Sequence, residues 1–387
     1  MSLASLAWPG ARGLRLCLVE TADFAFWTHR LHLGQAAREA GMEVHVIAPG
    51  GDRQRRIRDA GFIYHELSLD RAGTNPATEL KAVGELGRLY RKIRPDIVHH
   101  IALKSALYGA FAARAAGVPA IVGSLTGLGY TFIPGGLKRA LLRETVTLSL
   151  RAALRGSRVH TIFQNPDDRA FFLSRHLVNE RRTSVILGSG VDVQQFRPAP
   201  AVAGVPRICF GSRMLLDKGV AELVEALRLL RARGVAYEAS FAGTPDPANP
   251  ATITERELRA WEAEGLIEWH GQVRDMVGLL AKSHVACLPS YREGLPLFLA
   301  EAAACGKPAV TTDVPGCRSV VRHGQTGLLV PARNALALAG ALQRLIEQPA
   351  LRDQMGRAAR AFADAELSAV HVVGSIFEVY RRLLAAR

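Results

Sequence analysis

Short apolar runs rich in β-branched residues alternate along this chain with longer stretches of helical periodicity. Most runs are continuously apolar, which is typical of strands buried on both faces of a parallel sheet. In the first half the predicted strands are 14–20, 43–49, 97–103, 119–125, 160–165 and 184–188. In the second half they are 207–212, 237–243, 267–273, 285–289, 308–313 and 328–331. Helical patterns between them, such as 30–40, 221–233 and 335–347, predict right-handed parallel crossovers and an α/β chain.

A Pro/Ala/Gly-rich stretch at 196–204 divides the two blocks of six predicted strands and suits a linker. We therefore predict two doubly wound parallel-sheet domains, at 1–197 and 198–365. Residues 366–387 contain a last helical pattern without a strand of its own, which we expect to pack back on the first domain. Paired domains of this kind are expected to face each other across a cleft at the carboxyl ends of their strands.

Composition excludes several classes of protein. The chain has 387 residues, of which 49% are hydrophobic and 22% charged, which excludes disordered and fibrous chains. No apolar run reaches the roughly 18–20 residues that span a bilayer, and the first residues do not predict a secretion signal. Five cysteines show no C-x-x-C spacing, so buried thiols in a reducing cytoplasm are favoured over disulfides or a zinc site.

Most of the net charge of +14 falls in residues 1–200, which favours an anionic partner. A predicted helix near 137–158 has a basic arc. Its cations, the candidates for membrane contact, are Lys138, Arg139, Arg143, Arg151, Arg155 and Arg158. One interpretation is a solvated helix face; the other is a surface that lies against anionic lipid. Nucleic acid is not favoured as a partner, because the stretch lacks interleaved aromatic residues.

The segment 290–301 follows a predicted strand and begins a helix near Pro296. The free N–H groups of Leu297 and Phe298 at that terminus suit a phosphate. Glu293 precedes the terminus and Glu301 lies one turn after Leu297, so two carboxylates that accept from vicinal hydroxyls flank the phosphate position. The alternative is a pair of exposed glutamates favoured by the helix dipole.

A second segment, 211–219, places Arg213 at the end of a predicted strand and Lys218 at the start of the next helix, with Asp217 as its expected N-cap. Two cations at a strand end can converge on a diphosphate, Arg213 through forked hydrogen bonds and Lys218 as a point charge. The alternative is a pair of surface cations.

Together these segments resemble the retaining glycosyltransferases of family 4, which have the GT-B fold of two facing Rossmann-like domains. The resemblance rests on a Glu-x7-Glu pattern and an Arg-x4-Lys pair, and it extends over nearly the whole chain. The other matching motifs are Leu187-Gly-Ser-Gly-Val-Asp192 with Phe196, and Val314-Pro-Gly316. Four further segments look like the branch that assembles capsule, O-antigen and N-glycan sugars on undecaprenyl diphosphate. They are 23–30, 94–99, 126–130 and 164–168.

The resemblance implies roles for residues of the second domain. Arg213 and Lys218 would hold the donor diphosphate, assisted by the amides at the helix start. Glu293 would accept from the donor sugar and Glu301 from the ribose. The implied donor-binding set is Arg213, Lys218, Gln272, Val273, Glu293, Gly294, Leu297, Phe298 and Glu301, with Gln272 and Val273 at a strand end beside the base.

On the acceptor side, the resemblance implies that a loop at 21–27 closes over the reacting centre. The cleft candidates are Asp23, Phe24, His29, His99, Thr126, Gly127 and Asn165. For Asp23 a turn or cap is the alternative, and for His29 a place on its helix face. Many family members have a His where this chain has Thr126, which cannot ionise. His99 is a possible substitute, although a His in the core or the cleft wall is favoured.

The implied reaction is retaining transfer of a hexose or N-acetylhexosamine, with Arg213, Lys218 and Glu293 as the catalytic set. The donor is a nucleoside diphosphate sugar, with UDP suggested by the branch, and the acceptor is a sugar on undecaprenyl diphosphate. No Asp-x-Asp is present, so neither metal nor cofactor is expected. We expect a cytoplasmic protein on the inner face of the membrane. A nucleotide-sugar epimerase or hydrolase, and a non-catalytic membrane scaffold, remain as alternatives.

Overall fold

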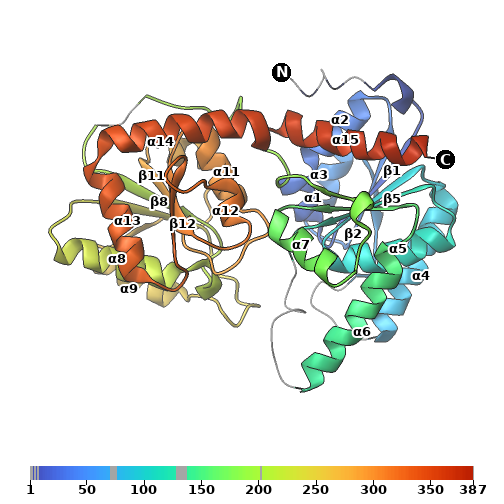
Figure 1. Ribbon diagram of the computed structural model, residues 1–387, viewed down its shortest axis with the longest axis horizontal. Helices are drawn as coiled ribbons and strands as arrows, with labels where there is room; N and C mark the ends of the chain where they lie inside the picture. The colour runs from blue at the N-terminus through green and yellow to red at the C-terminus, as the bar shows by residue number, and fades with distance from the viewer. Residues whose placement is uncertain are drawn as a thin grey trace. The chain divides into compact units, whose positions relative to one another are not determined.

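The computed structural model describes residues 3, 6, 8–69, 76–127, 137–200 and 203–386, with the side chains of 76, 77, 137–143 and 145 outside that description. The chain forms two compact units (Figure 1). Unit 1 contains Met1–Gly190 and Ala369–Arg387, and unit 2 contains Val191–Ser368. The expected divisions, at 197/198 and 365/366, thus lie seven residues after and three before those of the structure.

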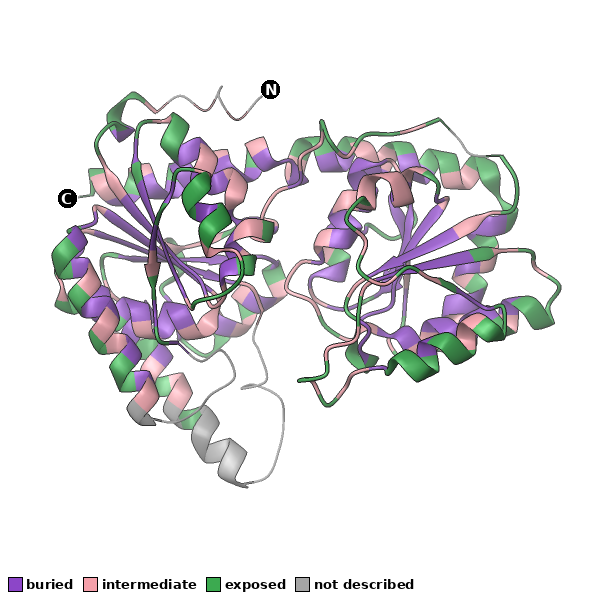
Figure 2. Ribbon diagram, turned by 180° about the vertical axis from the view of Figure 1, so that it is seen from behind, coloured by how far each residue is buried: buried purple, intermediate pink, exposed green. Residues whose placement is uncertain are grey.

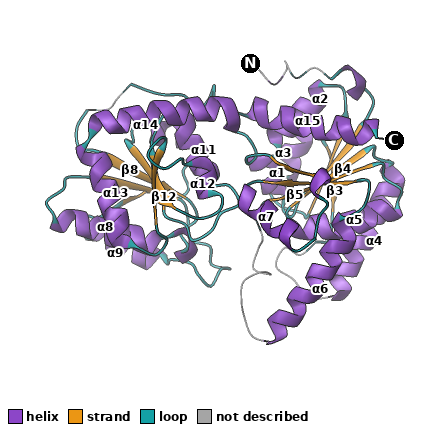
Figure 3. Cartoon of the chain, in the orientation of Figure 1, coloured by secondary structure: helices purple, strands orange, loops and turns teal. Residues whose placement is uncertain are grey.

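Unit 1 contains a parallel sheet whose seven described strands follow the order β3-β2-β1-β4-β5-β6-β7. The strands are β1 (Arg15–Val19), β2 (Glu43–Ala48), β3 (Ile63–Glu66), β4 (Ile97–Ile101), β5 (Ala120–Leu125), β6 (Val159–Phe163) and β7 (Thr183–Val185). The helices that flank this sheet (Figure 3) are α1 (Asp23–His29), α2 (Leu31–Glu39), α3 (Gln54–Asp59), α4 (Pro76–Ile93), α5 (Leu103–Ala115), α6 (Leu137–Leu154), α7 (Pro166–Ser174) and α15 (Ala369–Ala385).

The prediction of six strands in the first block is wrong because β3 is absent from it. β3 is a four-residue strand at the sheet edge, and exposed and buried positions mix along it. It therefore has no continuous apolar run to mark it. The prediction of a loop at 21–27 is also wrong for residues 23–27, because these residues belong to α1, which begins at Asp23.

The last helix of the chain, α15, contacts α2 and β5 of unit 1 (Figure 1). Its buried residues Phe377 and Tyr380 belong to the same hydrophobic cluster as Leu16 and Leu18 of β1. The helix therefore completes the core of unit 1, although the residues before it belong to unit 2.

Unit 2 contains a six-stranded parallel sheet, in the order β10-β9-β8-β11-β12-β13 over the described residues. The strands are β8 (Arg207–Gly211), β9 (Glu238–Ala242), β10 (Glu268–Trp269), β11 (Val285–Leu288), β12 (Ala309–Thr312) and β13 (Gly327–Val330). The helices are α8 (Val220–Ala232), α9 (Glu255–Ala263), α10 (Met276–Ala281), α11 (Leu297–Ala304), α12 (Cys317–Val320), α13 (Ala335–Glu347) and α14 (Pro349–Phe362). A short 3₁₀ helix, η5 (Leu216–Lys218), precedes α8.

The central strands of both sheets are buried along their length (Figure 2). β5 and β6 have no exposed residue in unit 1, and β11 and β12 have none in unit 2. This is why the strands appear in the sequence as largely apolar runs, although β6 also contains His160 and Thr161 and β12 ends in two threonines. All five cysteines are buried free thiols, as their spacing predicts.

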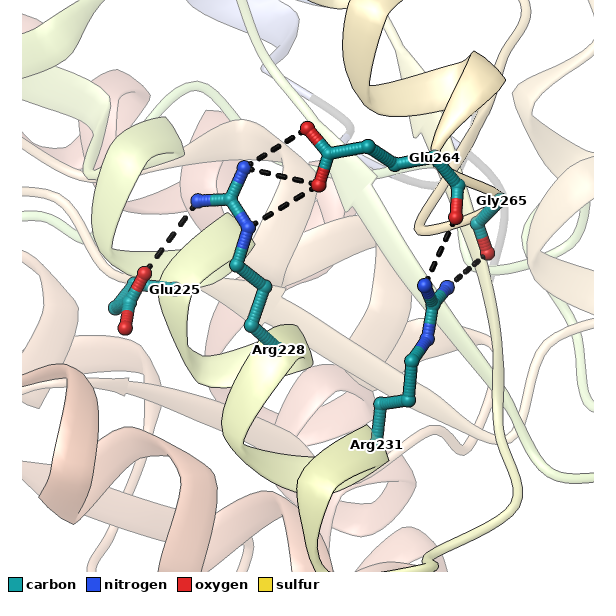
Figure 4. Close-up of polar contacts among 5 residues, drawn as sticks. All are labelled: Glu225, Arg228, Arg231, Glu264 and Gly265. Carbon is teal, nitrogen blue, oxygen red and sulfur yellow. Dashed lines mark hydrogen bonds and ion pairs between the residues drawn. The ribbon is translucent and has the colours of Figure 1, made fainter.

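Two arginines of α8 hold the end of α9 (Figure 4). Arg231 donates to the carbonyl oxygens of Glu264 (2.8 Å) and Gly265 (2.5 Å), which satisfies acceptors that the helix itself leaves free. Arg228 donates to both carboxylate oxygens of Glu264, at 3.0 and 3.1 Å, and to Glu225 at 3.4 Å. These hydrogen bonds join the carboxyl end of α9 to α8.

Candidate active site

The loops that follow β8, β9 and β11 meet at the carboxyl edge of the unit 2 sheet. β8 lies between β9 and β11 in the strand order, so the three strands end side by side. The residues predicted to hold a diphosphate, Arg213 and Lys218, follow β8, and Glu293 follows β11.

Lys218 and Glu293 meet in an ion pair. The Lys218 Nζ lies 2.5 Å from the Glu293 Oε1, and the Ser290 hydroxyl donates to the same oxygen at 2.7 Å. Both charged side chains are mostly buried. A lysine and a carboxylate 75 residues apart in the sequence thus meet at the strand ends. The lysine is able to bind an anion, and the carboxylate is able to accept hydrogen bonds from hydroxyl groups.

The loop between β11 and α11 is held by its backbone. The Glu293 N–H donates to the Pro315 carbonyl (3.3 Å), and the Thr312 hydroxyl donates to the Ser290 carbonyl. Gly316 has φ +82°, and a Cβ there would lie 2.6 Å from the carbonyl oxygens of both Glu293 and Gly294. The glycine of the Val314-Pro-Gly316 motif is therefore required for the close approach of the Glu293 loop.

The expectation that Asp217 caps the helix after β8 is wrong. The N-cap of α8 is Gly219, with φ +72° and no side-chain cap. Asp217 instead accepts a hydrogen bond at its carbonyl from the Tyr291 N–H (2.9 Å). A Cβ at Gly219 would overlap the Pro289 carbonyl, so a glycine is needed where these two loops touch.

α11 begins at the position that the sequence predicts. Pro296 is its N-cap and has no side-chain cap hydrogen bond, so Leu297 and Phe298 supply the first helical amides. Phe298 is buried against the end of β8, where a Cβ at Gly211 would overlap its ring. The helix start is thus fixed next to the strand that leads to Lys218.

Glu301 lies in the second turn of α11 and is half-buried. The described residues give its carboxylate neither a hydrogen bond nor an ion pair, and burial raises its pKa to about 8. An unpartnered acceptor at this place can bind a ligand hydroxyl group, because a hydrogen bond would stabilise its charged form.

Arg213 has a different partner. Its Nη1 lies 2.6 Å from the Asp246 Oδ2, in the loop after β9. β8 ends at Gly211, so Arg213 lies two residues beyond the strand and is half exposed. Sequence analysis missed Asp246, because only the neighbouring positions of β8 and β9 in the sheet bring it to Arg213.

Gln272 and Val273 are not at a strand end. β10 is limited to Glu268–Trp269, and both residues lie in the loop between β10 and α10. That loop is tied to the end of β9, since the Gly243 N–H donates to the Gly271 carbonyl at 2.7 Å.

Several predicted acceptor-side residues have structural roles in unit 1. Asp23 is buried; it accepts from the N–H groups of Phe24 and Arg53, both at 2.7 Å. Phe24 is 48% exposed. His29 lies at the end of α1, where burial lowers its pKa to about 4, so it is neutral at pH 7.

His99 and Asn165 are fully buried. The ring nitrogens of His99 bind the hydroxyl groups of Tyr380 and Ser124, both at 2.6 Å, and burial lowers the pKa of His99 well below its usual range. Asn165 caps α7 by accepting from the Asp168 N–H at 2.7 Å. His99 thus has the core position favoured for it, and the Asn165 side chain takes part in a helix cap of unit 1.

Thr126 and Gly127 follow β5 and are half-buried; residues 128–130 of their motif lie outside the described residues. The side chains of Lys138, Arg139 and Arg143 are also outside them. Arg158 is exposed in the turn before β6. Arg151 and Arg155 line a shallow hollow with Arg114 and Leu148, whose side chain is 63% exposed.

The described residues contain no helix long and apolar enough to cross a membrane. They also contain no group of three or more His, Cys, Asp or Glu side chains able to hold a metal ion.

Comparison with known proteins identifies both units. The model of the family described as glycosyl transferases group 1 matches residues 193–362, and that of the glycosyl transferase 4-like family matches residues 15–159. The two matches cover most of the chain.

One relative is the N,N'-diacetylbacillosaminyl-diphospho-undecaprenol alpha-1,3-N-acetylgalactosaminyltransferase of Campylobacter jejuni. It is 27% identical over 354 residues, 88% of this chain and 91% of the relative. Among solved structures, sucrose-phosphate synthase of Thermosynechococcus elongatus has a TM-score of 0.80 at 22% identity, over 97% of this chain and all of that one. Anabaena Alr3699/HepE in complex with UDP and glucose has a TM-score of 0.78 at 17% identity, over 95% and 99%.

Proposed function

Because the chain belongs to the family 4 glycosyltransferases with the GT-B fold and is a hexosyltransferase, we propose that it transfers a hexose or N-acetylhexosamine with retention of anomeric configuration. The proposed donor is a UDP-sugar, and the proposed acceptor is a sugar linked to undecaprenyl diphosphate. The product would serve cell-surface polysaccharide biosynthesis. The Campylobacter jejuni relative, whose name includes a diphospho-undecaprenol acceptor, supports this choice of acceptor.

The observation that best supports donor binding is the Lys218–Glu293 pair at the carboxyl edge of the sheet. Without a ligand, Glu293 neutralises the lysine. With a donor, the diphosphate would take the lysine as its partner, and Glu293 would be free to accept from a sugar hydroxyl. The Glu301 carboxylate, which has no partner among the described residues, would accept from the ribose.

Charge develops on the diphosphate oxygens as the glycosidic bond breaks. We propose that Lys218, Arg213 and the first amides of α11 stabilise that charge, which is usually the largest catalytic contribution. Arg213 would share its guanidinium between Asp246 and the diphosphate. The departing phosphate oxygen would take the acceptor proton on the same face of the sugar, so neither a side-chain base nor a metal is required.

The proposed place of action is the inner face of the membrane, where the lipid-linked acceptor would be met. Arg114, Arg151 and Arg155 line a hollow of unit 1 together with the exposed Leu148, and none of the described residues that line it is acidic. Cations around an apolar side chain suit anionic headgroups over acyl chains.

The test is transfer from a panel of nucleoside diphosphate sugars to undecaprenyl-diphosphate-linked acceptors, with the anomeric configuration of the product read by NMR. An α-linked product from an α-linked donor would support the proposal. Full turnover of the donor without acceptor would favour an epimerase or hydrolase. Binding of lipid without any turnover would favour a scaffold.

A further inference from the structure

Tyr291 lies two residues before Glu293, and three separate segments of unit 2 hold it. Its N–H donates to the Asp217 carbonyl at 2.9 Å. Its hydroxyl donates to the Glu222 Oε1 in α8 at 2.5 Å. The Arg333 Cζ lies 4.5 Å from the centre of its ring. Tyr291 therefore joins the loop that contains Glu293 to the segment that contains Lys218.

Arg333 adopts a backbone conformation that its side chain does not favour. It lies between β13 and α13 with φ +58°, in the left-handed region, where glycine would fit without strain. Its neighbour Asn334 caps α13 through the Ala337 N–H at 2.9 Å, which fixes the backbone there. The exposed Arg333 guanidinium lies over the Tyr291 ring, and this cation–π contact is one that a glycine at the same position could not make.

The Glu222 carboxylate accepts a hydrogen bond from the Tyr291 hydroxyl. Its second oxygen, Oε2, is buried and has no hydrogen-bond partner among the described residues. Burial and the nearby Glu222 carboxylate raise the pKa of Tyr291 to about 12, so its hydroxyl keeps its proton and continues to donate. The tyrosine is thus held at its ring, its hydroxyl and its backbone.

We propose that Arg333 is a positioning residue: its guanidinium covers Tyr291, and together with Glu222 it fixes the 290–296 loop so that Glu293 meets Lys218. The role of that pair in donor binding rests on the proposed function. The placement of the loop by Arg333 does not.

The experiment compares Arg333→Gly and Arg333→Lys with the wild type in the full chain. Hydrogen exchange of residues 290–296 is measured without ligand, and UDP affinity is measured by calorimetry. In Arg333→Gly we expect exchange to rise and UDP affinity to fall, each by about two- to fivefold, the size of a lost cation–π contact. Arg333→Lys keeps a cation over the ring and is expected to restore most of both.

Arg94→Gly is the matched control, because Arg94 is an exposed arginine with φ +53° in unit 1. It should change neither measurement. Unchanged exchange in Arg333→Gly would overturn the proposal, whatever the donor. Raised exchange with unaltered UDP affinity would support the placement of the loop by Arg333 and would contradict the role of the Lys218–Glu293 pair in donor binding. If the wild type bound no UDP, the proposed donor would be wrong, and the exchange comparison would still decide the role of Arg333.

Discussion

At the scale of single residues, the site depends on a lysine that is partly desolvated beside a carboxylate. Lys218→Ala is expected to lower kcat by about 10²–10³, the usual effect of removing one donor to a developing oxyanion. Arg213→Ala should act in the same direction. The measurement is steady-state transfer from the donor found active in the panel, with thermal unfolding recorded alongside.

Lys282→Ala is the control for this substitution, since Lys282 is an exposed lysine of unit 2 at the end of α10. It should leave kcat and the unfolding temperature unchanged. Near-normal kcat in Lys218→Ala, with the fold intact, would contradict the assignment of the diphosphate.

Glu301 gives a pH-dependent prediction. The pKa of its carboxyl is raised to about 8 by burial, against about 4.3 in an unfolded chain. Between these values the native state holds a proton that the unfolded state has lost, so stability falls as pH rises through this window. Wild type should therefore lose stability relative to Glu301→Gln between pH 5 and 8.

Chemical unfolding of both proteins across that range measures the difference. Glu257→Gln is the control, because hydrogen bonds from Thr254 lower the pKa of Glu257, and its contribution is lost only in more acidic solution. Its difference from wild type should be constant from pH 5 to 8. A constant difference for Glu301→Gln as well would show that this carboxyl is charged in the native protein.

At the scale of elements, two glycines with similar φ angles distinguish the cost of backbone strain from that of a steric contact. Gly316 (φ +82°) would place a Cβ against the Glu293 and Gly294 carbonyls, whereas Gly324 (φ +75°) has open space around it. Gly324→Ala should cost about 1 kcal/mol of stability and keep activity. Gly316→Ala should cost more, about 1–3 kcal/mol, and displace the Glu293 loop.

The two variants are compared by denaturant unfolding and by the donor KM. Equal losses of stability with an unchanged KM would mean that the Glu293 loop does not depend on its contact with Gly316.

The α6 region gives a prediction about lipid. Arg151 and Arg155 should hold the protein on anionic vesicles at low salt, and salt should release it by screening. Arg151→Glu with Arg155→Glu should abolish co-sedimentation, while the same change at the exposed Arg256 and Arg357 of unit 2 should not. Binding that ignores lipid charge would show that this face is merely solvated.

The elements that the sequence predicts well are those with strong local signals. Buried β11 is continuously apolar and β5 is apolar except for Ser124, and α11 begins beside a proline. β3 lacks such a signal because it is short and at an edge. Asp246 and Tyr291 could not be assigned, since their partners come from other segments and only the strand order brings them close.

At the scale of the whole molecule, the boundaries between the two units do not lie at the segment whose composition suggests a linker. Pro and Ala residues near 198–200 look like a linker, yet the units divide at Gly190 and again at Ser368. Arg360 of α14 explains part of this, because it donates to the carbonyls of Phe196 (2.9 Å) and Val193 (3.1 Å) and so holds this stretch in unit 2.

The chain therefore leaves unit 1 after Gly190 and re-enters it at Ala369. The last helix, α15, gives a prediction about the stability of unit 1. Tyr380 of α15 is fully buried and binds His99 of β4. Tyr380→Ala should leave a cavity that destabilises unit 1 by about 3–5 kcal/mol, as large-to-small core substitutions do. Because unit 2 has its own sheet and core, its amide protection should be unaffected.

Phe210→Ala is the corresponding substitution in unit 2, since Phe210 is fully buried in β8. Hydrogen exchange, followed for β4 and β8 in both variants, should show each substitution loosening only its own unit. Equal loss of protection in β8 when Tyr380 is replaced would mean that the two units unfold as one, and that α15 stabilises the whole chain rather than the unit whose core it completes.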